Sequence, residues 1–179
     1  MTISELSARI DKAIIRLDSE IEAQASKAGA DLVALVTNRV VQSGTASDGA
    51  SFTPYSQKKL PAFFYFNRSR TSSAEATVRQ KAKKREGISY RDFRGINGLN
   101  TSPKNFEFTG SMWRGFGVIR VARNATGVSV LIGGRNQDSE QKIGWGSEQE
   151  NKSIIRPSAE EIGIVKNNLQ RWVNSLLNG

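Results

Sequence analysis

The chain contains no cysteine and no histidine among its 179 residues. Without cysteine it has neither a disulfide framework nor a thiolate metal site. Without histidine it lacks the usual general base near neutral pH, the Ser-His and Cys-His nucleophile pairs, and the commonest zinc ligand. An enzyme of this composition would depend on Asp, Glu, Lys, Tyr or Ser alone. We therefore predict a protein that is not an enzyme, with no catalytic residue, no metal and no cofactor.

Long hydrophobic runs are also missing. A membrane-crossing helix needs about 18 or more predominantly apolar residues in a row, and the sequence has no such run. The first residues, Met1 to Glu5, include an acid and no uninterrupted apolar stretch, unlike a signal peptide. These absences predict a protein that has no membrane partner and is made in a cytoplasm.

Acidic residues are few relative to basic ones. Lys and Arg number 26 against 17 Asp and Glu, so the net charge is +9. A chain with this charge attracts polyanions, such as nucleic acid or an acidic protein surface.

The positive charge is concentrated in one segment. Eleven basic and three acidic residues lie between Lys58 and Arg94, which gives this segment a net charge of +8. We predict an irregular, basic insert at about 58–104 that contacts DNA phosphates or an acidic partner, the alternative being a solvated, mobile loop. The residues predicted to make this contact are Arg79, Lys81, Lys83, Lys84, Arg85, Arg91 and Arg94.

The first forty residues predict one helix, because apolar residues recur at steps of three and four. The stripe nearly repeats every eleven residues, at Ile3, Ile14, Ala25 and Val36, which favours a nearly straight helix. At about 1.5 Å per residue the helix would be about 60 Å long, enough to lean on a neighbouring subunit. Gly29 is a weak point, so the alternatives are a bent helix or two helices broken near Ser26–Gly29.

The remaining pattern predicts a single α+β domain over residues 1–179. Residues 113–121 and 127–132 are rich in β-branched and aromatic residues and flank a turn, which indicates a β-hairpin. Residues 142–147 and 153–155 are candidates for short further strands. Ser158 and Glu161 form a capping-box pattern before an apolar stripe, which predicts a C-terminal helix. The long first helix and the last helix would pack on this small antiparallel sheet.

Other chemical motifs are weak. Ser56 to Lys59 match the SxxK nucleophile pattern but lack its partner motifs. Gly133-Gly134-Arg135 follows a strand, and we interpret it as a turn rather than an anion site. We interpret a group of acidic residues in a predicted loop as a solvated face, and Trp145 as either a core plug or an exposed interface anchor. The acidic residues are Asp138, Glu140, Glu148 and Glu150.

Two short segments carry a family resemblance. The first is a turn followed by an aromatic-proline stretch, and the second leads into the predicted hairpin. Together they resemble the tail-completion, or head-to-tail joining, proteins of tailed bacteriophages. The matching residues are Asp48, Gly49, Phe52, Pro54, Tyr55 and Ser56 in the first segment, and Phe106, Thr109, Gly110 and Met112 in the second. The chain departs from that family in having no His after the hairpin and in its longer basic insert.

The resemblance implies a structural virion protein of the neck, the connector between the capsid portal and the tail. It implies a homo-oligomeric ring of about six subunits, or twelve nearer the portal. The partners would be other neck, portal-adaptor and tail proteins, with non-specific contact to DNA in the channel. Such a protein would be made in the bacterial host cytoplasm.

Two alternatives remain open at this point. One is a free-standing, sequence-nonspecific nucleic-acid-binding protein, such as a packaging or ribosome-associated factor, with strongly salt-dependent DNA binding. The other is a metal-dependent nuclease or other hydrolase that uses Asp138 or Glu148.

Overall fold

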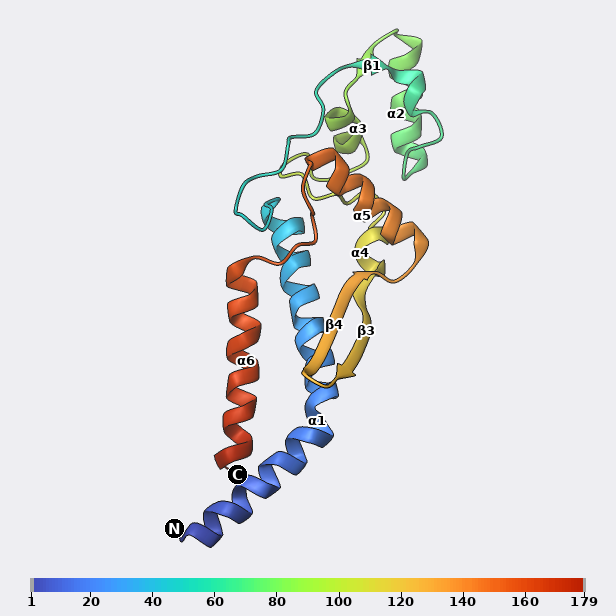
Figure 1. Cartoon of the computed structure of the whole chain (residues 1–179). Helices are drawn as coiled ribbons and strands as arrows, with labels where there is room; N and C mark the ends of the chain where they lie inside the picture. Colours follow the sequence, from blue (N-terminus) through green and yellow to red (C-terminus); the bar gives the residue numbers. More distant parts are fainter. Residues whose placement is uncertain (1, 179) are drawn as a thin grey trace.

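One long helix, α1 (Ile3–Asn38), runs through most of the computed structural model, which describes residues 2–178 (Figure 1). The helix begins with a capping box. The Glu5 N–H donates to Thr2 Oγ1 at 3.2 Å, and the Thr2 N–H donates to the Glu5 carboxylate at 2.7 Å. At its other end α1 continues into a single π-helical turn, η1 (Arg39–Ser43), and stops at Gly44, whose φ of 61° is left-handed. The predicted long helix is confirmed.

Helix α1 passes through Ser26–Gly29 without a break, so the alternative of two helices is wrong. Its first part curves away from the rest (Figure 1), as the bent-helix alternative expected. Gly29 has a packing role. A Cβ at this position would lie 2.6 Å from Val130 Cγ1 and 2.9 Å from Val118 Cγ2. The glycine therefore lets the hairpin approach the helix backbone.

The hairpin consists of β3 (Phe116–Asn124) and β4 (Gly127–Gly134), paired antiparallel. Their register shifts between Val118 and Arg120, where an irregularity gives β3 an extra residue. The predicted hairpin is confirmed, but its first strand begins later than expected. Trp113 lies instead in a short helix, α4 (Ser111–Gly115).

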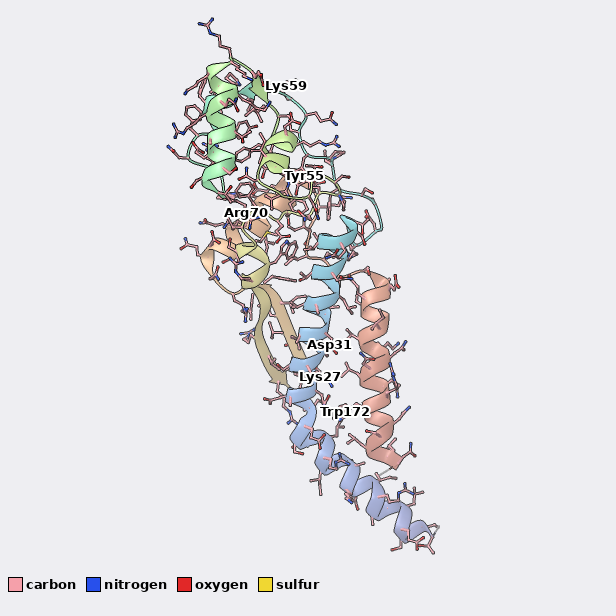
Figure 2. The ribbon with its side chains drawn as sticks, turned by 180° about the vertical axis from the view of Figure 1, so that it is seen from behind. Lys27, Asp31, Tyr55, Lys59, Arg70 and Trp172 are labelled. Atoms are coloured by element: carbon pink, nitrogen blue, oxygen red, sulfur yellow. The ribbon has the colours of Figure 1, made fainter. Side chains whose placement is uncertain are left out.

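The C-terminal helix α6 (Ala159–Asn178) lies beside α1, on the side away from the hairpin (Figure 1). Its predicted capping box is present, because the Glu161 N–H donates to Ser158 Oγ at 3.2 Å and the Ser158 N–H donates to the Glu161 carboxylate at 2.7 Å. Trp172 is half-buried against α1, and its Nε1–H donates to Glu20 at 3.3 Å. Figure 2 shows Trp172 on the α1 side of α6.

The predicted strand at 142–147 is wrong, because these residues belong to helix α5 (Gln137–Glu150). The helix begins directly after the Gly133-Gly134-Arg135 turn. The Asn136 side chain caps it by accepting from the Ser139 N–H at 2.9 Å. Residues 153–155 form no strand either.

The basic insert is largely ordered structure, contrary to the prediction of an irregular segment. It contains β1 (Leu60–Pro61), the 3-10 helix η2 (Ala62–Tyr65), α2 (Ser72–Lys83), β2 (Gly87–Ile88) and α3 (Tyr90–Ile96). Strands β1 and β2 pair antiparallel. Helix α2 matches the short helix that the sequence allowed at 73–85, and α3 begins with its own capping box, Ser89 with Asp92.

Two hydrophobic clusters stabilise this α+β fold. One lies at the C-terminal end of α1 and joins it to α4, α5 and the hairpin; the other holds the insert together beyond that end (Figure 1). Within residues 2–178, no helix has both the length and the apolar character that crossing a membrane requires. The buried members of the first cluster are Val36, Val40, Ala46, Phe52, Met112, Phe116, Ile143 and Ile154; those of the second are Ala62, Tyr65, Val78, Ile88 and Phe93.

Candidate functional site

The two motif segments that carry the family resemblance meet in one groove. Residues 53–56 and 106–112 line opposite parts of it, and α5 completes the wall with Lys142, Trp145 and Gln149. The groove has a volume of about 650 Å³. Trp145 stands on its rim with 61 % of its surface exposed, so the exposed alternative for this residue is the one observed. Segments 50 residues apart in sequence thus form one surface.

A buried polar network supports the floor of this groove. The Tyr55 hydroxyl donates to Asn105 Oδ1 at 3.0 Å and accepts from the Asn105 N–H at 3.1 Å. Arg94 Nη2 donates to the same Oδ1 at 3.1 Å, and its guanidinium lies 4.1 Å from the centre of the Tyr55 ring. Burial raises the pKa of the Tyr55 hydroxyl, which keeps it neutral and able to donate.

Arg94 is therefore not a DNA contact, and that prediction is wrong. Only 1 % of its surface is exposed. Its remaining donors bind the backbone carbonyls of Asn100 and Glu107. The sequence shows only another basic residue in a basic segment, because the carbonyls that bind Arg94 come from the loop that follows α3.

A buried ion pair lies beside the network. Lys104 Nζ donates to Glu150 Oε1 at 2.7 Å and to Gln149 Oε1 at 2.9 Å, and the Thr53 N–H donates to Glu150 Oε2 at 2.9 Å. Burial alone raises the pKa of Glu150, but the hydrogen bonds from Lys104 and Thr53 outweigh it and leave that pKa lowered. Glu150 is thus part of the interior, not of the solvated acidic loop that was predicted.

The other acidic residues of that predicted loop lie on α5 and do not converge. Asp138 pairs with Lys142 at 2.7 Å, and Glu148 is ten residues further along the helix, about 15 Å away at ~1.5 Å per residue. Across residues 2–178, no cluster of three or more acidic side chains is placed to hold a metal ion.

The motif residues divide into structural and exposed positions. The Asp48 side chain accepts from the Ala50 N–H at 2.9 Å, and Gly49 has a φ of 80°, so both shape a turn. Gly110, with a φ of 74°, precedes α4. Phe52 packs edge-on against Phe106, with ring centres 4.9 Å apart. Met112 is buried with Phe52 in the first cluster, whereas the residues exposed along the groove are Pro54, Ser56 and Thr109.

Six of the seven predicted basic contacts lie outside the buried network, most of them on the insert surface around α2. Arg79 is exposed, although it pairs with Glu75 at 2.9 Å and lies 4.8 Å over the Phe66 ring. Lys81 is half-buried and pairs with Glu86 at 2.8 Å. Arg91 is exposed on α3. The exposed residues at the C-terminal end of α2 are Lys83, Lys84 and Arg85, and Lys59 lies close by, next to the β1–β2 pair (Figure 2).

A second surface feature is the start of α1, which extends past the ends of both the hairpin and α6 (Figure 1). We call residues 3–15 the arm. It presents a continuous apolar stripe to solvent, and Ile3 at its tip is 89 % exposed. The exposed apolar residues of the arm are Ile3, Leu6, Ile10, Ile14 and Ile15. The helical spacing of this stripe was visible in the sequence, but its exposure was not.

Comparison with known proteins identifies no relative: no family model, no curated protein and no solved structure matches this chain.

Proposed function

We propose that this protein is a structural subunit of a larger assembly, a ring in the neck that joins head and tail of a tailed bacteriophage. The observation that carries the proposal is the apolar arm of α1. A monomer gains nothing from holding a row of isoleucines in water, whereas a neighbouring subunit can bury them. Burial of such a stripe is the ordinary source of affinity between subunits.

The neck assignment rests on the two motif segments that resemble the tail-completion proteins. Their meeting in one groove supports it, because residues shared with a family are expected to lie together when they serve one surface. The proposed ring has six subunits, or twelve nearer the portal, and contacts other neck, portal-adaptor and tail proteins. It works without a cofactor, a metal or a catalytic residue, and it is made in the host cytoplasm.

The experiment that tests self-assembly is light scattering on purified protein across concentration and salt, followed by negative-stain imaging. We expect rings, or a monomer that becomes a ring when neck proteins are added. Ile10→Glu should abolish assembly, whereas Ala23→Glu, at another exposed position of α1 outside the arm, should not. A chain that stays monomeric under all these conditions contradicts the proposal.

The basic tip of the insert favours a second candidate, non-specific nucleic-acid binding. Lys83, Lys84 and Arg85 are exposed together, and in residues 2–178 none of them has an acidic partner. A cluster of this kind binds phosphates and releases counterions. If it does, replacing Lys81, Lys83, Lys84 and Arg85 with Ala should weaken duplex binding and reduce its salt dependence. Tight binding by an isolated monomer that never assembles favours this candidate over the ring.

A further inference from the structure

The hairpin has a second apolar face that its own chain does not cover. Val118 and Val130 point towards α1, since both would contact a Cβ on Gly29. Side chains alternate along a strand, so Leu131 points the other way, and it is 52 % exposed. Ile119, at the strand irregularity, is 48 % exposed and lies over Gly133 on this same outer face.

The charges of the arm region and of the hairpin are complementary. Residues 3–22 contain five acids and three bases, although the chain as a whole is strongly basic. The hairpin and its flanks, residues 114–135, contain four arginines and no acid. Arg120 is directly opposite Leu131 on the neighbouring strand, and Asp11 flanks the apolar stripe of the arm.

We propose that the arm of one copy packs on the outer face of the hairpin of the next copy. This inference rests on the proposed self-assembly and specifies the contact. The isoleucine stripe covers Ile119 and Leu131, while Asp11 meets Arg120. Each hairpin is then held between its own α1 and the arm of its neighbour.

The charges distinguish this joint from a symmetric one. Two arms packed against each other would bring two acidic ends together, whereas arm on hairpin pairs the acidic end with the most uniformly basic face. Because donor and acceptor surfaces differ, the joint is head-to-tail. Such a joint closes into a ring when its rotation permits.

The absence of cysteine allows a clean test. Ile10→Cys in one copy and Leu131→Cys in a second copy, carrying tags of different size, are mixed and oxidised. We expect a disulfide-linked pair of the two different copies, with little linkage in either variant alone. The control acceptor is Lys166→Cys on α6, an exposed position away from the hairpin, which should not link to the arm.

Linkage of Ile10→Cys to itself, or to Lys166→Cys, overturns the proposal. So does an assembling protein in which the Ile10 and Leu131 positions never link, although the proposed ring function then stands. A wild-type chain that never assembles defeats both. A second measurement uses Asp11→Arg and Arg120→Asp, both at exposed positions. Each alone should weaken assembly at least tenfold, and the two variants mixed should recover it.

Discussion

Removal of Glu150 from its buried pair with Lys104 should be among the most damaging single changes in the chain. The Lys104 side chain is 5 % exposed and that of Glu150 is 2 % exposed, with their charged atoms 2.7 Å apart. Glu150→Ala leaves an ammonium group buried without its counter-charge and leaves the Thr53 N–H without its acceptor. Breaking a buried pair in this way costs about 3–5 kcal/mol of unfolding free energy.

The assay is thermal and urea unfolding followed by circular dichroism. For a chain of this length, each kcal/mol corresponds to a change of about 2–4 °C in Tm, so Glu150→Ala should lower Tm by roughly 6–20 °C. The control is the double variant Lys104→Met with Glu150→Leu, which removes both charges at similar volume. It should lie close to the wild type, because apolar replacement of a buried pair is often neutral.

The pair also fixes a pH dependence. The pKa of Glu150 is lowered on folding, so the carboxylate contributes stability that is fully present above its unfolded pKa. That stability is lost as the pH falls through the folded value. The wild type should therefore lose more stability than Glu150→Ala between pH 5 and the acid limit. A single variant as stable as the wild type, with the same acid profile, would refute a buried, charged pair.

Three further changes test other parts of the fold by urea unfolding. Gly29→Ala should destabilise by about 1–2 kcal/mol, because the cost of crowding Val130 exceeds the gain in helix propensity; an increase in stability would contradict the close approach of the hairpin. Gly144→Ala in α5 should stabilise by about 0.5–1 kcal/mol, since a Cβ there meets nothing within 4 Å; a loss would mean that the helix is packed differently. Tyr55→Phe should cost about 1–3 kcal/mol by leaving Asn105 without its hydroxyl partner, and a neutral result would remove the network from the account of the groove.

The elements that could be predicted from the sequence have strong local patterns. Helices α1 and α6 announce themselves by long apolar stripes with capping residues, Thr2 and Glu5 at one and Ser158 and Glu161 at the other. The hairpin has β-branched strands around a short turn. In each case the information lies within a few neighbouring residues.

The elements that were missed lack that local information. Helix α5 contains Gly144 and Gly146, poor helix formers, and only a few apolar residues at helical spacing. The insert looked irregular because α3 has only seven residues. The burial of Arg94 and Glu150 depends on partners at 105 and 104, distant in sequence, so no pattern around either residue indicates it. Helix α1 predicted a neighbour by its length, but the surface that meets the arm required the hairpin's two faces.

The continuity of α1 has a mechanical consequence. The same helix forms the arm at one end and, through Val36 and Val40, a wall of the core at the other, with no loop between them. A joint made through the arm therefore has no hinge. The tilt between neighbouring subunits is set by a rigid rod rather than by a linker, so an assembly built this way should have one fixed curvature and a single subunit number.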